Sequence, residues 1–356
     1  MTFWRNAFLV SLLGAVLVIG GCSSDDDNSV EPQDTTAPTV SISSPTPGEI
    51  VSGDQMLVLV SVSDDVGVVK VEVYLDGATT PTATLTQSPW QFTVSLAGLA
   101  DGDHTVQAAA YDAAGNKGTS MSVTFKKGQP PDNEVKRVVL CEMFTNAGCG
   151  PCKPANEAYE QYISNPLVNS LVATIKYHVW WPSASDIFYL ANPSQVQTRT
   201  AYYAVNSAPT LRVNGDVDGS YDYPKWSGLI AGQMKKKPEV KIDIKRTLNN
   251  DVLLVETTLT GVEEHSYSDL VYFVVLTETN LFYSGGNGEF EHFNVMRKML
   301  TGDQGEAVTV NKGDVVSKSV QTTLDSNWKK DKLEIIVFVQ SRSTKRVLQA
   351  AKLKVQ

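Results

Sequence analysis

The amino-acid sequence predicts a multidomain α+β protein, in which an N-terminal β-sandwich precedes a central α/β domain and a C-terminal β-sandwich. Valines alternate with other residues along 58–62 and 69–73, and Asp-Gly turns separate such runs, which is typical of antiparallel strands. Residues 135–144 instead form a nearly continuous apolar run, as expected for a strand buried on both faces. Strand patterns return after residue 238. A chain of 356 residues is also too long for one ordinary core.

The charge balance disfavours one class of partner. The formal net charge is −9, with 30 Lys and Arg against 39 Asp and Glu. Binding of nucleic acid needs a basic stripe. The one clear basic run, residues 235–237, is better explained as the last turn of a helix, where cations suit the helix dipole. We therefore expect no nucleic-acid partner.

The N-terminus reads as an export signal that precedes the fold. Residues 7–21 are apolar but too short to span a membrane, and they end in the stretch "IGGC". This stretch resembles a bacterial lipobox, which implies that residues 1–21 are removed and that Cys22 is lipidated. The alternative is an ordinary cleaved signal followed by a chance cysteine. We expect a lipid-anchored protein of the cell envelope, at the outer membrane. The following "SSDDD" resembles a tag for export to the cell surface.

The first folded domain is expected at residues 38–127, after a disordered tether at 22–37. Its phrases "VSDDVGVVKVEVYLDG" and "LADGDHTVQAAAYDAAGN" resemble the bacterial immunoglobulin-like family, which implies a small β-sandwich. Asp64, Asp65, Asp112 and Asn116 offer oxygen ligands for calcium. We favour the simpler interpretation that they are turn residues bonded to their own backbone, and we expect no metal site.

The central α/β domain is expected at residues 135–237, after a Pro-containing linker at 128–134. A buried strand at 135–144 is followed by apolar residues at helical spacing over 155–163, a second buried strand at 171–177 and a helix at 194–204. A strand at 210–213, an Asn-Gly turn and a last helix at 223–237 complete it. Residues 238–356 hold six further strand patterns, which predict the C-terminal sandwich. The interruption at 283–300 is expected to be a large loop or a short helix.

The pair Cys149–Cys152 in "NAGCGPCKPA" permits three interpretations: a redox pair, half of a metal site or a structural staple. A zinc site needs two more ligands, but there is no second pair and the four histidines are scattered, so we disfavour it. The redox interpretation needs the pair between a buried strand and a helix. There the helix N-terminus favours the thiolate of Cys149, and Cys152 follows one turn later to resolve a mixed disulfide. Pro151 stiffens the turn where its missing N–H costs little.

A second signal lies downstream, where Pro209 enters a strand and is expected to follow a cis peptide bond. Together, "CGPCK" and "APTLRVNG" resemble the thioredoxin superfamily. The resemblance implies that Cys149 attacks, that Cys152 resolves, and that the loop of Pro209 faces them. Gly150, Pro151, Ala208 and Thr210 would line the substrate face.

The chain also departs from the thioredoxin pattern. Gly148 stands where thioredoxins usually carry Trp, and Glu142 is the one acid near the position of their buried proton acceptor, although its register is off by about one residue. The aromatic loop at 177–189, with His178 and Trp180, is expected to cap the site. His178 is the kind of isolated histidine that is more often structural. Cys141 is most simply a buried small hydrophobic residue.

From residue 135 to the end, several phrases resemble the outer membrane protein 28-related lipoprotein family, among them "IKYHVWWP", "AYYAVNSAPTLRVNG" and "HFNVMRKMLTGDQGE". This resemblance implies a thioredoxin-like domain with a C-terminal β-sandwich, and it leaves the activity open. We expect no cofactor. Two hypotheses remain. The chain exchanges disulfides with exported proteins through Cys149 and Cys152, or it binds a surface ligand and the pair is a structural disulfide. Fold alone does not decide between them.

Overall fold

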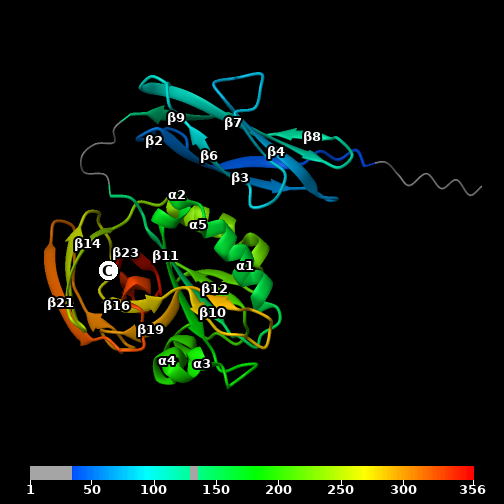
Figure 1. Cartoon of the computed structure of the whole chain (residues 1–356). Helices are drawn as coiled ribbons and strands as arrows, with labels where there is room; N and C mark the ends of the chain where they lie inside the picture. Colours follow the sequence, from blue (N-terminus) through cyan, green and yellow to red (C-terminus); the bar gives the residue numbers. More distant parts are fainter. Residues whose placement is uncertain (1–33, 129–134) are drawn as a thin grey trace, which may run out of the picture.

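The computed structural model describes residues 34–128 and 135–356. The expected signal peptide, Cys22, most of the tether and the linker residues 129–134 lie outside the described residues. Within them the chain is multidomain and β-rich (Figure 1).

An Ig-like β-sandwich comes first. The strands of its two sheets are β1 (Thr39–Ser44), β3 (Gln55–Ser63) and β6 (Gln91–Ser95) in one, and β2 (Ile50–Val51), β9 (Val123–Lys127), β7 (Gly102–Asp112), β4 (Val68–Leu75), β5 (Ala83–Leu85) and β8 (Lys117–Thr119) in the other. Alternate residues of the strands face inward, so that Val58, Val73 and Val106 are fully buried between the sheets. The Asp76-Gly77 turn takes positive φ at both residues, which explains why this dipeptide links β4 to the next segment.

The rest of the chain is built on one large sheet that crosses the boundary expected at residue 238. Its strands in spatial order are β13 (Val217–Ser220), β12 (Thr210–Val213), β10 (Val139–Thr145), β11 (Val172–His178), β19 (Val295–Met299), β16 (Leu270–Glu278), β22 (Leu333–Ser341) and β23 (Val347–Lys354), and β20 (Glu306–Ala307) also pairs with β16. Strand β10 is parallel to β11 and antiparallel to β12. The junction is β19, which pairs with β11 on one side and with β16 on the other.

A second, three-stranded sheet packs on the C-terminal part of the large sheet. It consists of β14 (Val240–Asn249), β15 (Val252–Gly261) and β21 (Val315–Thr323). Leu253, Val255 and Leu259 pack against Val274, Leu276 and Val337 between the two layers. A C-terminal sandwich is therefore present, but one of its layers continues into the central sheet. The segment 283–300, where a large loop or a short helix is expected, contains strands β18 (Glu291–His292) and β19.

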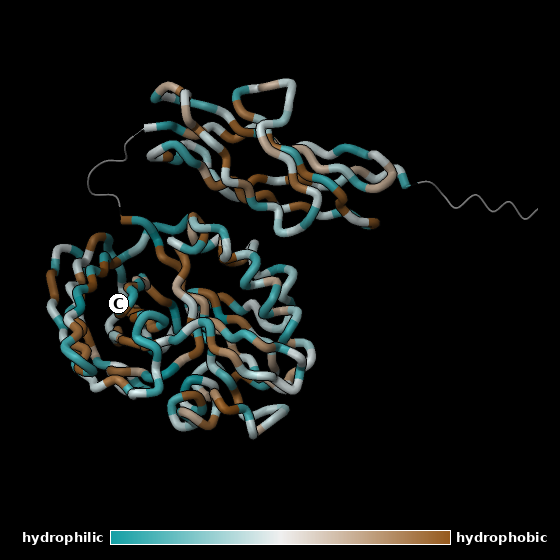
Figure 2. The backbone as a smooth tube through the Cα atoms, viewed as in Figure 1, coloured by the Kyte–Doolittle hydropathy of each residue, from teal (hydrophilic) through white to brown (hydrophobic). Residues whose placement is uncertain are grey.

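Helices cover both faces of the large sheet (Figure 1). They are α1 (Cys152–Ile163), α2 (Pro166–Ser170), α3 (Ile187–Ala191), α4 (Pro193–Tyr202) and α5 (Trp226–Met234), with a 3₁₀ turn at Tyr223–Lys225 before α5 and another at Lys330–Lys332. Helices α1 and α5 pack on the face that carries Cys141 and Met143, whereas α3 and α4 pack on the face that carries Leu140 and Phe144. Figure 2 shows apolar residues concentrated along the central strands of the sheet.

The Ig-like sandwich lies against helices α1, α2 and α5 (Figure 1). Leu59 of β3 joins the apolar cluster that contains Tyr162 and Ile163 of α1. The amide of Gln91 donates to the Tyr162 carbonyl at 2.8 Å, and that of Asn165 donates to the Thr93 hydroxyl at 3.1 Å.

Candidate functional site

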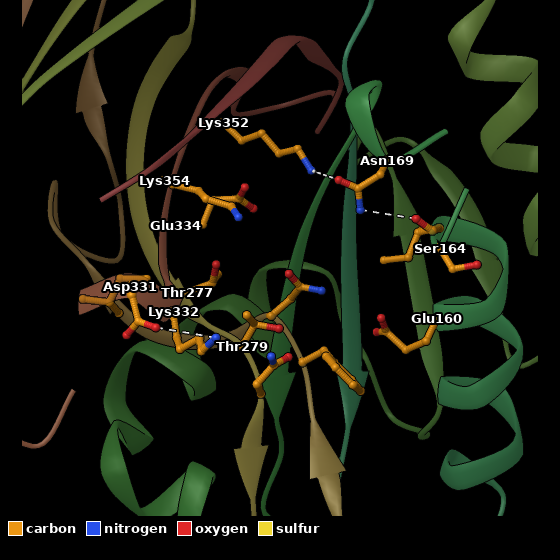
Figure 3. Close-up of a pocket in the computed structure, with 15 residues that line it drawn as sticks. Glu160, Ser164, Asn169, Thr277, Thr279, Asp331, Lys332, Glu334, Lys352 and Lys354 are labelled. Atoms are coloured by element: carbon orange, nitrogen blue, oxygen red, sulfur yellow. Dashed lines mark hydrogen bonds and ion pairs between the residues drawn. The ribbon is translucent and has the colours of Figure 1, made fainter. Parts of the chain in front are cut away.

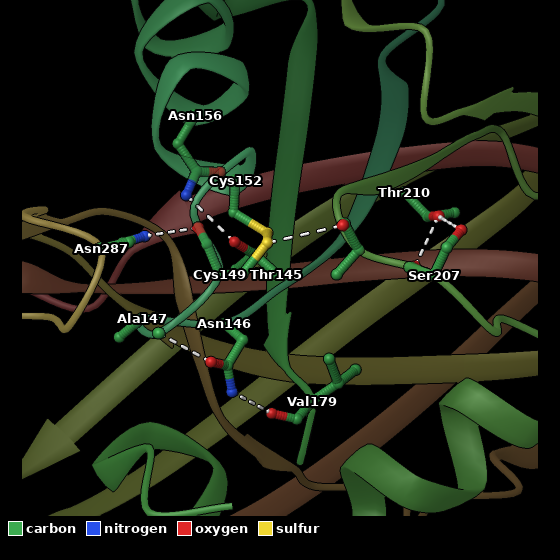
Figure 4. Close-up of a disulfide and its surroundings, with 12 residues drawn as sticks. Thr145, Asn146, Ala147, Cys149, Cys152, Asn156, Val179, Ser207, Thr210 and Asn287 are labelled. Carbon is green, nitrogen blue, oxygen red and sulfur yellow. Dashed lines mark hydrogen bonds between the residues drawn. A yellow bond between two sulfur atoms is a disulfide. The ribbon is translucent and has the colours of Figure 1, made fainter. Parts of the chain in front are cut away.

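The cysteine pair lies between a buried strand and a helix, as the sequence predicts. All seven residues of β10 are buried, and the chain leaves the sheet after Thr145. Helix α1 begins at Cys152, with Pro151 at its N-cap. Cys149 and Cys152 form a disulfide with their Cα atoms 5.3 Å apart (Figure 4). In the oxidised protein these two sulfurs are bonded to each other, so they are not thiolates that could bind a metal.

The loop of Pro209 faces this disulfide. The Ala208–Pro209 peptide bond is cis, and the Sγ of Cys149 lies 3.5 Å from the Ala208 carbonyl oxygen (Figure 4). A disulfide sulfur carries no proton, so a hydrogen bond to Ala208 would form only in the reduced protein. Thr210 is buried, and its hydroxyl donates to the Ser207 carbonyl at 2.8 Å, so it stabilises the loop instead of lining an open face.

A short hairpin covers the cysteine loop. It consists of β17 (Leu281–Phe282), β18 (Glu291–His292) and the turn between them. Asn287 donates from its backbone to the Ala147 carbonyl at 3.0 Å and from its side chain to the Cys149 carbonyl at 3.1 Å. Lys153 of α1 donates to the Gly288 carbonyl at 3.1 Å. Cys149 is consequently only 2% exposed and Cys152 is fully buried, while Gly150 and Pro151 remain exposed.

Two glycines permit this close cover. A Cβ atom at Gly285 would lie 2.6 Å from the Ala147 carbonyl oxygen, and one at Gly148 would lie 2.8 Å from the Cβ of Ser183. Both distances are shorter than real Cβ atoms tolerate. The absence of a tryptophan at position 148 therefore has a steric reason: the neighbouring loop occupies the space that a side chain would need.

The aromatic loop holds the cysteine loop through Asp186. The Asp186 carboxylate accepts from the Ala147 N–H at 2.7 Å and from Nδ1 of His178 at 2.8 Å, and it caps α3 by accepting from the Phe188 N–H at 2.9 Å. Burial would raise the pKa of Asp186, but the hydrogen bonds and the nearby His178 outweigh it and lower the pKa overall. His178 is buried, and its hydrogen bond to Asp186 connects it to the cysteine loop.

His178 and Trp180, the two residues of the aromatic loop expected to cap the site, lie in different surroundings. Trp180 is 36% exposed and packs edge-on against Trp181, with ring centroids 4.5 Å apart. The ring of His178 lies tilted against that of Phe188, and the ring of His292 from the covering hairpin lies 5.7 Å from that of His178. The aromatic loop therefore supports the cysteine loop from the side, and the hairpin provides the cover.

The assignment of Glu142 as a proton acceptor for Cys152 is corrected by its surroundings. Its carboxylate accepts from Arg199 at 2.7 and 2.9 Å and from the hydroxyls of Tyr177 and Tyr203. Successive residues of a strand point to opposite faces. Glu142 lies on the α4 face, whereas helix α1, which carries Cys152, packs on the other face beside Cys141.

Cys141 is the free thiol of the described residues, and it is fully buried beside α1. Burial raises the pKa of this thiol to about 12, against the opposing hydrogen bond with Tyr159. A thiol with such a pKa does not supply a thiolate at neutral pH, so Cys141 is a packing residue.

Sequence reasoning missed the polar residues that fix the cover. Asn156 of α1 donates to Thr145 at 3.1 Å and to Glu289 of the hairpin at 2.8 Å. One of the missed residues had a local signal, since an Asp directly before an apolar helical run, as at Asp186, is a typical N-cap. Asn287 and Glu289 had none, because they contact residues more than 130 positions away.

Asp64 and Asp112 of the Ig-like domain behave as turn residues. Asp64 accepts from the backbone of Val66 and Gly67 at 3.1 and 2.8 Å, and Asp112 accepts from the Asn116 N–H at 2.8 Å. These are the local hydrogen bonds that favour Asp in turns.

Two family models match the chain. Residues 38–108 match the bacterial Ig domain, and residues 196–356 match the outer membrane protein Omp28. The chain therefore carries an Omp28-family region behind a bacterial Ig domain. The resemblances to the bacterial immunoglobulin-like family and to the Omp28 family are thereby confirmed. The Omp28 match begins inside α4, so Cys149 and Cys152 precede it.

Comparison with solved structures adds a likeness of fold. HBP35 of Porphyromonas gingivalis is 17% identical with a TM-score of 0.52, over 62% of this chain and 76% of that chain. A domain of the outer membrane lipoprotein Omp28 from Porphyromonas gingivalis is 16% identical, over 33% of this chain and 88% of its own, with a TM-score of 0.25. Fibronectin(III)-like modules of Clostridium thermocellum CbhA are 27% identical, over 25% and 94%, with a TM-score of 0.23. None of the curated proteins compared with the chain matches it. Within residues 34–128 and 135–356, no helix is long and apolar enough to cross a membrane.

Proposed function

We propose that this chain is a lipid-anchored outer-membrane protein whose thioredoxin-like central part exchanges disulfides with exported proteins through Cys149 and Cys152. One contact carries the proposal. The sulfur of Cys149, just before the start of α1, lies 3.5 Å from the carbonyl oxygen of Ala208 in the loop that contains the cis Pro209. Strand β10 between a parallel and an antiparallel neighbour, followed by α1, supports the thioredoxin-like assignment.

The exchange starts from the oxidised pair that the structure contains. A thiolate of the substrate attacks the Sγ of Cys149, a mixed disulfide forms, and the bond to Cys152 breaks. Cys152 leaves as a thiolate and takes up a proton. A second substrate thiolate then attacks the substrate sulfur of the mixed disulfide and releases Cys149 as a thiolate, which the N-terminus of α1 stabilises. The substrate dithiol is thereby oxidised and the protein is reduced.

The covering hairpin must move before a protein substrate reaches Cys149. The hairpin carries an exposed aromatic pair, Phe282 and Phe290, which are 62% and 60% exposed with ring centroids 5.5 Å apart. Such a pair offers apolar aromatic surface to a partner. An unfolded exported polypeptide would meet this pair first and displace the hairpin.

A second candidate function is favoured by the 2% exposure of Cys149. Reactive cysteines are partly exposed, whereas buried ones are inert. In this case the disulfide is a structural staple and the chain is a surface binding protein.

Substitution at Gly285 distinguishes the two functions. Gly285→Ala should lift the hairpin because its Cβ would lie 2.6 Å from a carbonyl oxygen, whereas Gly286→Ala is a matched control whose Cβ would lie 3.7 Å from the nearest atom. For an exchange site, the wild type oxidises a dithiol peptide, Gly285→Ala does so roughly tenfold faster, the control does not, and Cys149→Ser abolishes the reaction. If neither the wild type nor Gly285→Ala oxidises the peptide, the disulfide is structural and the chain is a binding protein.

The lipid anchor is tested separately. Labelling of cells with a radioactive fatty acid should mark the wild-type chain, and Cys22→Ser should remove the label and release the protein from the membrane fraction. A labelled Cys22→Ser protein would contradict the anchor at this residue.

A further inference from the structure

A cavity lined by both charged and apolar groups opens at the other end of α1, where the helices meet the C-terminal strands (Figure 3). Its volume is about 470 Å³, within the range of small-molecule sites. The last turn of α1 and α2 form one wall, and the ends of β16, β22 and β23 form the other. Such junctions between structural units are a common place for ligands.

Part of the charged lining is already paired by the protein. Glu160 forms an ion pair with Lys176 at 2.6 Å, and Asp331 forms one with Lys332 at 3.5 Å. Lys352 donates one proton to Asn169 Oδ1 at 2.9 Å, which fixes the position of its ammonium group (Figure 3). The two ion pairs leave little net charge at their groups, whereas Lys352 keeps its positive charge because its partner Asn169 is neutral.

Two further charges point into the cavity without such partners. Glu334 and Lys354 lie directly opposite each other on β22 and β23, and Lys352 follows on the same face, opposite Ile336. Among the described residues, neither Glu334 nor Lys354 forms a side-chain hydrogen bond or an ion pair to another residue. Burial raises the pKa of Glu334, while Lys352 and Lys354 oppose the change; burial likewise lowers the pKa of Lys352. The carboxylate of Glu334 and the ammonium of Lys352 are thus partly dehydrated and gain from an added partner.

We propose that this cavity binds a small zwitterion, a free α-amino acid or a short peptide, with its ammonium group on Glu334 and its carboxylate on Lys352 and Lys354. A simple anion would meet the carboxylate of Glu334, and a simple cation would meet two ammonium groups. A zwitterion forms charge-assisted hydrogen bonds with both signs. Ile163, Phe293 and Leu333 provide the apolar part of the lining, which suits an apolar side chain.

Titration calorimetry on the full chain with four probes tests the proposal. The probes are L-leucine, glycyl-L-leucine, N-acetyl-L-leucine, which lacks the ammonium group, and L-leucinamide, which lacks the carboxylate. At least one zwitterion should bind, and each blocked analogue should bind roughly tenfold more weakly or worse, since each loses a hydrogen-bonded charge. The relative affinities of leucine and the dipeptide then show whether the cavity prefers a free amino acid or a short peptide.

Variants assign each terminus to its partner. Glu334→Gln should remove the preference for leucine over N-acetyl-leucine, and Lys354→Gln should reduce the preference for leucine over leucinamide. Glu306→Gln is the matched control, because Glu306 lies on β20 outside the cavity and pairs with Lys318 at 3.6 Å. Thermal scans confirm that each variant is folded. The Cys149→Ser/Cys152→Ser protein should bind like the wild type, since the cavity is independent of thiol exchange.

The proposal is overturned by absence of binding of both zwitterions up to about 10 mM, the weak limit of a specific site. It is equally overturned if all four probes bind alike, which would indicate a purely apolar pocket. The same holds if Glu334→Gln and Lys354→Gln lose no more affinity than the control Glu306→Gln.

Discussion

The two ends of helix α1 lie in contrasting surroundings. At the N-terminal end the disulfide is covered by a hairpin, and Asn156 and Asp186 bind their neighbours through several hydrogen bonds. At the C-terminal end, Glu334 and Lys354 face a cavity, and no other described residue bonds their charged groups. Buried polar groups held by several hydrogen bonds fix one structure, whereas polar groups left without partners are available to a ligand. We call the N-terminal end of α1, under the hairpin, the closed end, and the C-terminal end, at the cavity, the open end. Mutation should therefore reduce stability at the closed end but not at the open end.

Removal of Asp186 should have the largest effect at the closed end. Asp186→Ala leaves the buried N–H groups of Ala147, His178 and Phe188 without their acceptor. The free energy of unfolding should fall by about 3 kcal/mol, as expected for several orphaned donors. Urea denaturation measures it. The control Asp222→Ala removes an exposed ion pair with Lys225 and should cost under about 1 kcal/mol. A loss of similar size in both variants would contradict the contrast.

Loss of the disulfide should have a smaller effect. Cys149→Ser/Cys152→Ser opens a loop of three-residue separation, for which chain entropy predicts a loss of about 2 kcal/mol. The same urea experiment measures it, with reduced wild-type protein as the comparison. A variant as stable as the oxidised wild type would show that the cover, and not the disulfide, holds the closed end.

Acid should weaken the closed end through His292. Burial lowers the pKa of His292, His178 lowers it further, and Glu289 and Asp186 oppose the change. Because the folded-state pKa lies below the unfolded value of about 6.5, the unfolded state takes up the proton first, and stability falls as the pH drops below that value. The pKa of Asp186 is lowered, so its carboxylate stays charged over this range.

The measurement is the difference in unfolding free energy between pH 7 and pH 5. The wild type should lose stability by less than the disulfide contributes. His292→Phe keeps an aromatic ring beside Phe188 and should reduce this pH dependence. An unchanged pH dependence in His292→Phe would assign the effect to another group.

The sequence predicted what local patterns specify and missed what distant contacts specify. The apolar run of β10, the Cys pair at the start of α1 and the six C-terminal strand patterns each follow from residues close in the chain. The continuity of the sheet through β19 does not, because pairing with both β11 and β16 depends on partners far away. The role of Glu142 was wrong for a related reason: the all-apolar pattern around it did not show which face would carry α4 and Arg199.

The smallest effect is expected at the open end, and its sign is opposite. Burial raises the pKa of Glu334, so the charged carboxylate lowers the stability of the folded state at neutral pH. This penalty is relieved as the pH falls through the raised folded-state pKa, and it is absent below the unfolded value near 4.3. Glu334→Gln should therefore leave stability unchanged or raise it by about 0.5 kcal/mol at pH 7, the size of a surface change. Urea denaturation of this variant beside Glu306→Gln measures the difference. A clear loss of stability in Glu334→Gln would mean that the carboxylate already has a partner inside the protein, and both ends of α1 would then be closed.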